Sequence, residues 1–253
     1  MKNLAPWVFL VGAGAYLVVQ RHGKRGGATN EEVNASAPGD DVIPHPMVET
    51  THAVTIEAPP SDVWPWLVQG GYRGAGRAGW YTDSWFDMLV EAGYLRLTTP
   101  AGELTEHPGA RSHTAILPGF QHVAVGDIVP DGTPGSAFFV VKGIDPERSL
   151  VLYSDSHLKY ISPVFLRDSA WASSGDFTWA FLLTPLEGQR TRLILRTRGN
   201  LEPARLREVF LPIFYLAEAI IPGQTLRGVK WRAEATDRGD RPAPSPAPHA
   251  NTR

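Results

Sequence analysis

The segment FTWAFLLTPLEGQRTRLILRTRG, residues 177 to 199, decides the fold class of this chain. Its first half carries large apolar side chains at every second position: Phe177, Trp179, Phe181 and Leu183. After the turn-forming residues LEGQR, Leu193 and Leu195 repeat the alternation. Because successive side chains of a strand point to opposite faces, the two halves predict paired β-strands, and a sheet with an apolar face.

Strand-forming sequence also precedes this pair. Four earlier segments are rich in β-branched and aromatic residues: THAVTIEA (51–58), SHTAILP (112–118), HVAVGDIVP (122–130) and AFFVVKGIDPERSLVLYSD (137–155). After the first of them, PPSDVWPWLVQGG (59–71) predicts a short helix that Ser61 caps and Gly70 ends. The aromatic segment GWYTDSWFDML (79–89) predicts a second short helix, capped near Asp83 or Ser84.

A long helical pattern follows the last strand. Apolar residues recur there at steps of three and four: Leu206, Val209, Phe210, Ile213, Phe214, Ala217 and Ile220. We expect Pro212 and Pro222 to kink or break this helix, and a shorter helix to follow over residues 224–235. This order of elements indicates the α+β class, with a curved antiparallel sheet wrapped around a long C-terminal helix. Such an architecture encloses space, so it predicts a pocket.

Composition argues against several classes of function. The formal net charge of −2 leaves no excess of basic residues to neutralise nucleic-acid phosphates. The chain has no cysteine, which excludes disulfides and thiolate metal sites. The eight histidines show no metal-ligand spacing, and a helix precedes GAGRAG (74–79) where a dinucleotide site requires a buried strand. We therefore expect no metal, no cofactor and no nucleic-acid partner.

The first twenty residues are suited to a membrane. Residues 4–20 are uncharged and almost wholly apolar. As a helix they span about 25 Å, close to the hydrocarbon thickness of a bilayer. Arg21, Lys24 and Arg25 follow, so the positive-inside rule places the rest of the chain in the cytoplasm. We expect residues 1–20 to be a transmembrane helix; the alternatives are a signal peptide cleaved at AGA (13–15) and a buried soluble helix.

Two further segments differ in composition from a folded domain. Residues 21–46 are rich in Gly, Pro, Asn and acidic residues, which predicts a flexible linker. Residues 236–253 alternate Pro with small residues, which predicts a disordered tail. One folded domain remains between them, over residues 47–235.

Five blocks in order resemble bacterial members of the START-like (SRPBCC) superfamily. They are VTIEAPPSDVWPWLVQGG (54–71), RAGWYTDSW (77–85), FQHVAVGDIVP (120–130), TWAFLLTPLEGQRTRLILRTR (178–198) and LRGVKWRAE (226–234). The superfamily includes lipid-transfer domains and aromatic polyketide cyclases. The resemblance implies a helix-grip fold, with an apolar cavity between the sheet and the C-terminal helix. It implies no catalytic residues, because this fold carries many different activities.

The residues expected to line or gate the cavity are mostly aromatic: Trp66, Trp80, Tyr81, Trp85, Phe86, Trp179, Phe210 and Phe214. Indole and phenol rings offer a large apolar face with a polar tip, which suits a lipid tail or a polyketide ring. The alternative is that the rings of segment 79–89 only pack the short helices onto the sheet.

Two charged residues join this set. Arg196 shares a strand face with Arg192 and Arg198, and we expect it to reach a buried carboxylate, Glu218, or an anionic ligand. The alternative is that these arginines cover a solvent-facing sheet surface. Glu218 lies beside the apolar stripe of the long helix.

These patterns predict a membrane-anchored domain that binds a hydrophobic small molecule, such as a lipid or a polyketide- or isoprenoid-like compound. One alternative is a cyclase or dehydratase acting in the same cavity, with Glu218, Asp83 or Tyr81 moving a proton. Another alternative is a partner-binding module without catalysis. We expect a ligand-binding protein rather than an enzyme.

Overall fold

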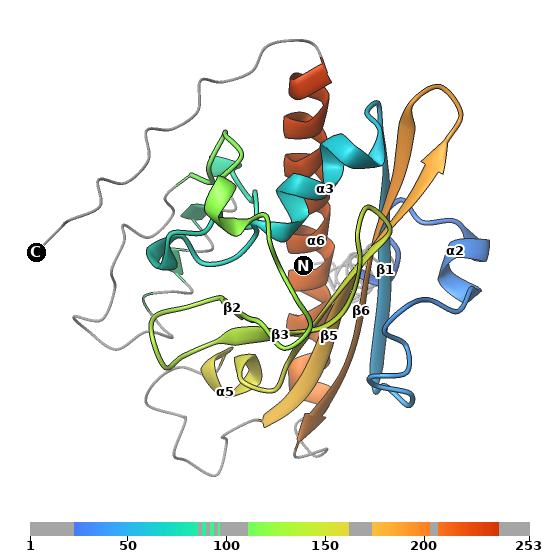
Figure 1. The fold of residues 1–253 in the computed structure, drawn as a ribbon. Helices are drawn as coiled ribbons and strands as arrows, with labels where there is room; N and C mark the ends of the chain where they lie inside the picture. Colours follow the sequence, from blue (N-terminus) through green and yellow to red (C-terminus); the bar gives the residue numbers. More distant parts are fainter. Residues whose placement is uncertain are drawn as a thin grey trace, which may run out of the picture.

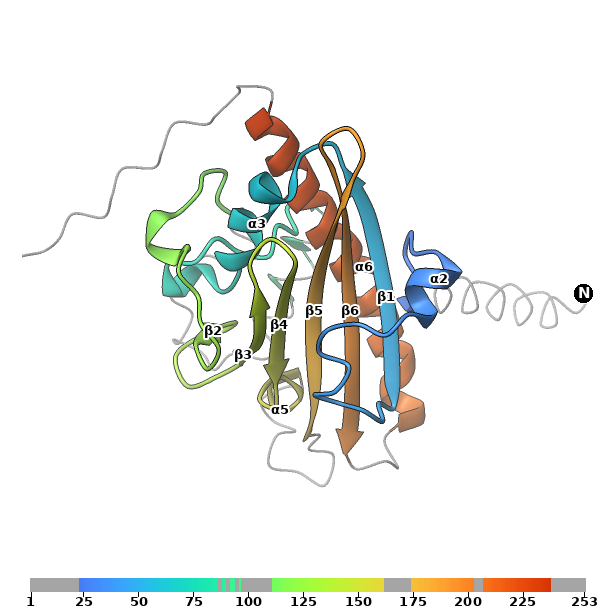
Figure 2. The same ribbon diagram turned by 45° about the vertical axis from the view of Figure 1, so that its right-hand side comes forward.

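A computed structural model of the chain describes residues 23–85, 88–89, 92–93, 96, 111–161, 174–202 and 207–237. Figures 1 and 2 show one curved sheet with a long helix lying across one of its faces. The strands are β1 (Val48–Ile56), β2 (Ile128–Pro130), β3 (Phe138–Asp145), β4 (Ser149–Ser154), β5 (Ser174–Leu186) and β6 (Arg190–Glu202). The helices are α2 (Asn30–Asn34), α3 (Pro60–Val68), α5 (His157–Ile161) and α6 (Arg207–Asp237), with 3-10 turns η1 (Arg73–Ala75) and η2 (Pro118–Phe120).

The sheet is antiparallel throughout, with the strand order β1-β6-β5-β4-β3-β2. The predicted strand pair is β5 and β6, which place Phe181 opposite Leu195. The alternation predicted from the sequence therefore holds, and these apolar side chains share the face that α6 covers, which we call the inner face. On the opposite, outer face of β6 lie Arg192, Arg196 and Arg198.

The core lies between the inner face, α6 and α3. Among its largest fully buried side chains are Ile56, Phe139, Leu152, Phe181, Leu193 and Leu195 from the sheet, with Val63 from α3 and Val229 from α6. Helix α3 confirms the short helix predicted after β1. Its N-cap is Pro59, and Ser61 makes no capping hydrogen bond, so the expected cap was wrong. Pro60 occupies a first-turn position, where a missing N–H costs nothing.

Two strand predictions were too generous. Residues 112–118 form no strand, and only the last three residues of segment 122–130 join the sheet as β2. Gln69, at the end of α3, holds residues 112–118 in an irregular conformation. Its side chain donates to the Ala115 carbonyl (3.3 Å) and accepts from the Leu117 N–H (2.8 Å). These side-chain bonds replace the ladder that a strand would have formed.

Helix α6 runs unbroken for 31 residues, through both Pro212 and Pro222. The expected break and the separate helix over 224–235 were therefore wrong. A proline inside a helix removes one backbone hydrogen bond and costs about 3 kcal/mol. Tertiary packing offsets this cost here, because Glu218 and Leu226 on either side of Pro222 are both buried against the rest of the fold. In Figure 1, α6 runs from the top of the domain to its bottom.

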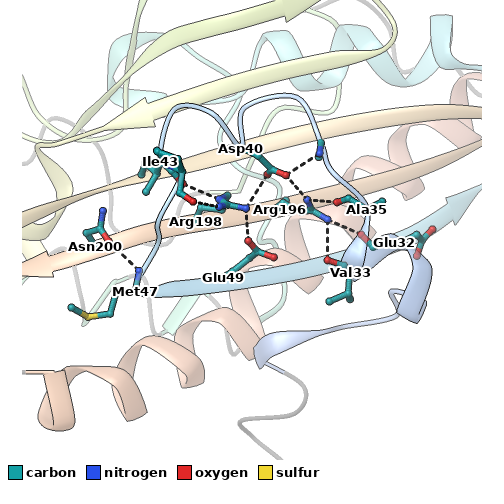
Figure 3. A network of polar contacts seen from close by, with 12 residues as sticks. Glu32, Val33, Ala35, Asp40, Ile43, Met47, Glu49, Arg196, Arg198 and Asn200 are labelled. Atoms are coloured by element: carbon teal, nitrogen blue, oxygen red, sulfur yellow. Dashed lines mark hydrogen bonds and ion pairs between the residues drawn. The ribbon is translucent and has the colours of Figure 1, made fainter.

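Residues 23–47, which we call the N-terminal strap, pass along β1 and across the outer face (Figure 3). Helix α2 has a capping box between Thr29 and Glu32. Arg196 donates to the carbonyls of Ala35 (2.8 Å) and Glu32 (2.6 Å) and pairs with Asp40 (2.9 Å). The described part of segment 21–46 is thus docked, and our prediction of a flexible linker was wrong for it.

The two ends of the chain fall mostly outside the described residues. The expected anchor, residues 1–20, lies outside them, and so does the predicted tail after Asp237. Of the helices that the structure describes, none combines the length and the apolar character needed to cross a bilayer.

Candidate functional site

The inner face carries a cluster of aromatic rings across β3 and β5, which we call the aromatic floor: Phe139, Phe177 and Trp179, with Trp80 packed on them. The ring centroids of Phe139 lie 5.5 Å from Phe177 and 5.4 Å from Trp179. Trp80 stands at 82° to Trp179, with 5.2 Å between centroids. Phe177 is only partly buried although it points to the inner face. Trp80 is also partly buried, so this floor is an apolar surface with two partly accessible rings, Phe177 and Trp80.

A polar relay borders the floor on the β2–β4 side. His157 Nε2 lies 2.7 Å from Asp131 Oδ2, and His157 Nδ1 lies 2.6 Å from Ser154 Oγ. An ionised carboxylate only accepts, so Nε2 carries the proton and Nδ1 accepts from the Ser154 hydroxyl. The other Asp131 oxygen accepts a hydrogen bond from Trp80 Nε1 (2.5 Å). Asp131, His157 and Ser154 form a chain along which a proton can be passed or held.

Local structure fixes this relay. Ser154 is the last residue of β4, and α5 begins three residues later at His157. The Ser154 oxygen accepts the backbone N–H groups of Ser156 (3.1 Å) and His157 (3.3 Å), which orients the first turn of α5. The imidazole packs against Phe139, with 4.4 Å between ring centroids. The relay and the floor are thus one rigid unit.

A buried acid lies on the other side of the floor. Glu218 on α6 is 6% exposed, and its carboxyl accepts a hydrogen bond from the Thr50 hydroxyl on β1 (2.5 Å). Burial raises the pKa of Glu218 from 4.5 to about 7, against the opposing effect of the Thr50 hydrogen bond. Glu218 can therefore change protonation state near neutral pH, which is typical of general acids and bases.

His52 completes the polar group around Glu218. Its Nε2 lies 3.9 Å from Glu218 Oε2 and 3.1 Å from the Gly23 carbonyl oxygen, and its Nδ1 accepts the Gly26 N–H (3.2 Å). Burial lowers the pKa of His52 from 6.5 to about 4. His52 is therefore neutral at neutral pH, with both nitrogens bonded to the strap.

Strand register relates the acid to the floor. Thr50 pairs with Thr197, and Thr197 pairs with Trp179, so the three residues lie in one row across β1, β6 and β5. With about 4.8 Å between neighbouring strands, the backbone of Thr50, which holds the Glu218 carboxyl group, lies roughly 10 Å across the sheet from the Trp179 backbone. The inner face thus presents an apolar surface with a titratable acid on one side and an imidazole on the other.

The structure assigns different places to the residues predicted from the sequence. Trp80, Trp179 and Glu218 come together at this site. Trp66 is buried in the core, with its ring 6.1 Å from that of Tyr81. Phe214 is partly buried and contacts Tyr215 (5.7 Å). Trp85 is 75% exposed.

Two other candidates, Phe86 and the side chain of Phe210, lie outside what the structure describes. Tyr81 turns to the opposite side of its segment from Trp80. Its hydroxyl donates to the Trp66 carbonyl (2.6 Å) and accepts from Gln69 Nε2 (3.2 Å). Burial raises the pKa of the Tyr81 hydroxyl. Tyr81 is therefore held away from the floor.

The expected contact between Arg196 and Glu218 was wrong, because they lie on opposite faces of the sheet. Arg196 is 2% exposed, and its partners are the strap carbonyls and Asp40. The alternative of a solvent-facing arginine surface also fails, since the strap covers it (Figure 3).

Sequence reasoning missed His157, Asp131, Phe139 and Phe177 as site residues. Their signals were present, because Phe177 belongs to the quoted alternation and Asp131 directly follows β2. They converge only through the pairing of β2 to β5, which the sequence does not show. Within the described part of the chain, no group of three or more His, Asp or Glu side chains could hold a metal ion.

No family model matches the sequence, and no curated protein matches it either. Among solved structures, a polyketide-cyclase-like protein from Corynebacterium glutamicum is 12% identical, covers 81% of this chain and 97% of its own, and has a TM-score of 0.39. An aromatase/cyclase from Streptomyces sp. R1128 is 14% identical. The alignment covers 76% of this chain and 97% of the aromatase/cyclase, with a TM-score of 0.33.

A third similar structure is the Aha1 protein from Colwellia psychrerythraea, which is 12% identical. The alignment covers 70% of this chain and 98% of the Aha1 chain, with a TM-score of 0.30. Identities and TM-scores this low assign no activity to the chain. The fold follows from the coordinates themselves: six antiparallel strands in one curved sheet, and one long C-terminal helix across the inner face. The chain has a helix-grip fold, as the resemblance in its sequence predicted.

Proposed function

We propose that this protein binds a hydrophobic small molecule, a lipid or a polyketide- or isoprenoid-like compound, on the inner face of its sheet. The aromatic floor is the observation that carries the proposal. It combines Phe177, a partly accessible ring, with the rings of Phe139 and Trp179 behind it. An apolar ligand that loses 200 Å² of accessible surface there would gain about 5 kcal/mol.

The two polar groups beside the floor support a ligand with a hydroxyl, carbonyl or carboxyl group. A protonated Glu218 can donate a hydrogen bond to a ligand oxygen, and an ionised Glu218 can accept one. His157 is braced by Asp131 and Ser154, so its ring is held in one orientation. A few fixed polar groups at the border of an apolar surface are what ligand pockets use to orient a bound molecule.

Binding can be tested on the full-length chain with oleic acid, farnesol and emodin as probes. Native mass spectrometry and calorimetry would report a complex with at least one of them. Phe177→Ala, which removes one of the two partly accessible rings, should weaken that complex by about 2 kcal/mol or more. Leu186→Ala, at the exposed end of the same strand, is the matched control and should bind like the wild type. If Phe177→Ala binds the probe as tightly as Leu186→Ala and the wild type do, the floor is excluded as the ligand site.

A second candidate function is proton transfer on a bound polyketide-like substrate, as in a cyclase or dehydratase. The specific observation in its favour is Glu218, whose pKa of about 7 suits a general acid or base at neutral pH. In this case Glu218→Gln would keep affinity for the substrate but abolish turnover. Turnover that persists in Glu218→Gln with an unchanged pH profile rejects this role.

Membrane anchoring by residues 1–20 is a separate part of the proposal. It rests on the apolar sequence before Arg21, and it would hold the floor near a reservoir of hydrophobic compounds. Membrane fractions washed with alkaline carbonate should retain the full-length chain and lose a chain that lacks residues 1–20. Release of both chains by carbonate would reject the anchor without affecting the binding proposal.

A further inference from the structure

A cavity lies away from the aromatic floor. It is a cleft of about 410 Å³ between the C-terminal half of α6 and the segments 81–84 and 111–114. None of the residues that line it belongs to the floor or to the relay. Its volume falls within the range of small-molecule binding sites.

The charge of this cleft is strongly positive. Three arginines line it, Arg111, Arg227 and Arg232, against one carboxylate, Asp83. Asp83 is already bound, because it pairs with Arg232 and accepts the Ser112 N–H (2.8 Å). Arg111 and Arg227 are exposed, and neither forms an ion pair with another described residue. Within the described part of the chain, these two guanidinium groups line the cleft without a carboxylate partner of their own.

The inner wall of the cleft is rigid. Arg232 is buried and lies over the Tyr81 ring, with 4.6 Å from Cζ to the ring centroid. Its Nε donates to the His113 carbonyl (2.9 Å), which ties α6 to segment 111–114. Tyr81 is held at a φ of 65°, an unfavourable angle for a residue with a side chain. A wall fixed in this way does not need to reorganise when a ligand binds.

An exposed indole supplies the apolar part of the cleft. Trp231 is 57% exposed and belongs to the same lining as Arg227 and Arg111. The ring face of tryptophan can pack against alkyl chains and flat rings. The cleft thus combines guanidinium groups for an anion with one large apolar surface.

We propose that this cleft binds an amphipathic anion, with its carboxylate or phosphate on Arg111 and Arg227 and its apolar part on Trp231. Guanidinium groups bind both acid groups through paired, charge-assisted hydrogen bonds. The site is separate from the aromatic floor, so it goes beyond the function proposed above. Such an acid group could belong to a free amphiphile or to the headgroup of an anionic lipid.

Calorimetry on the full-length chain tests the proposal with decyl phosphate and decanoate, and with decanol as the uncharged analogue. Both acids should bind more tightly than decanol. The double variant Arg111→Gln/Arg227→Gln should weaken the binding of decyl phosphate by roughly tenfold or more. Trp231→Ala should weaken the binding of all three probes. Arg148→Gln, an exposed arginine on the β3–β4 turn, is the charge-matched control and should bind like the wild type.

Vesicles of phosphatidylcholine with one-fifth phosphatidylglycerol separate the two sources of the acid group. Weaker vesicle binding by the double variant than by the wild type assigns the site to lipid headgroups. Unchanged vesicle binding together with lost decyl phosphate binding assigns it to a free amphiphile. Wild-type affinity for decyl phosphate in the double variant, or decanol binding as tight as decyl phosphate, would overturn the proposal. Neither result depends on Phe177, so the test is independent of the one for the aromatic floor.

Discussion

Glu218 on α6 and Thr50 on β1 are joined by a buried hydrogen bond, with 2.5 Å between Oε2 and Oγ1. This bond fixes the first half of α6 to the edge of the sheet, at the row that also contains Trp179. It also places a carboxyl group where water does not solvate its charge. The protonation of one residue is thereby linked to the stability of the fold.

The pH dependence of stability should reveal this link, together with an opposing effect from His52. The pKa of Glu218 is raised from 4.5 to about 7, so its stabilising effect is present below pH 4.5 and lost as pH rises to 7. The pKa of His52 is lowered from 6.5 to about 4, so its effect is present above pH 6.5 and lost as pH falls to 4. Between pH 4.5 and 6.5 the two effects cancel, and the free energy of unfolding contributed by this pair should stay nearly constant.

Single variants should separate the two contributions. In Glu218→Gln the His52 effect remains alone, and the free energy of unfolding should rise by about 1.4 kcal/mol per pH unit between pH 4 and 6.5. In His52→Gln the Glu218 effect remains alone, and stability should fall by a similar amount per unit between pH 4.5 and 7. Urea unfolding of both variants and the wild type across this range measures the slopes. Parallel profiles for all three proteins would show that neither residue has the environment described.

Two glycines on α6 provide a matched pair of substitutions. A Cβ on Gly228 would stand 2.2 Å from the Tyr81 carbonyl oxygen, whereas one on Gly223 would meet only the mobile end of Arg227, at 3.5 Å. Gly223→Ala should therefore stabilise the protein by up to about 1 kcal/mol, through helix propensity. Gly228→Ala should destabilise it by about 2 kcal/mol or more, since backbone must move. Thermal unfolding of the two variants measures these changes in stability. A stabilising Gly228→Ala would contradict the close approach of segment 81–84 to α6.

Arg196 should be the main anchor of the N-terminal strap. Its guanidinium is buried and binds three strap carbonyls and Asp40, so Arg196→Met leaves these acceptors without a donor. We expect a loss of about 3 kcal/mol. Amide hydrogen exchange in residues 28–42 should accelerate more than exchange in β5. The control is Arg148→Met, whose exposed ion pair with Asp145 should be worth less than 1 kcal/mol. Unchanged exchange in the strap of Arg196→Met would show that other contacts hold it.

The relay at the aromatic floor has a spectroscopic signature. Nitrogen chemical shifts of His157 should report the tautomer protonated at Nε2, because Asp131 accepts there and Ser154 donates at Nδ1. Ser154→Ala removes that donor and leaves two backbone N–H groups unsatisfied, so it should cost about 1–3 kcal/mol. Ser156→Ala is the neighbouring control and should keep the tautomer. An Nδ1-protonated His157 in the wild type would rule out the relay.

Alternation of apolar residues was sufficient to predict the β5–β6 pair, because the apolar side chains of each strand face one core. The same reasoning found Trp179, but not its partners in the floor. Phe139 and His157 reach the same place through the pairing of β3, β4 and β5, which joins residues far apart in the chain. Local patterns contain no information about which strands are neighbours.

Two errors have a common cause. Prolines predict a break in α6 and polar composition predicts a free strap, since both arguments consider only the segment itself. In the folded chain α6 packs against a sheet, and the strap pairs with arginines more than 150 residues away. Tertiary contacts therefore reversed both local preferences.

The strap has one more consequence, which follows from the position of β1 at the end of the sheet. A strand in that position offers unpaired backbone groups to any other extended chain, and exposed edges of this kind promote self-association. Here the Gly26 carbonyl accepts the Ala53 N–H (2.8 Å), and the strap then crosses the outer face (Figure 3). The strap thus occupies part of this edge and leaves fewer unpaired backbone groups for a second chain. We therefore expect a chain that lacks residues 23–47 to self-associate more readily than the full-length chain.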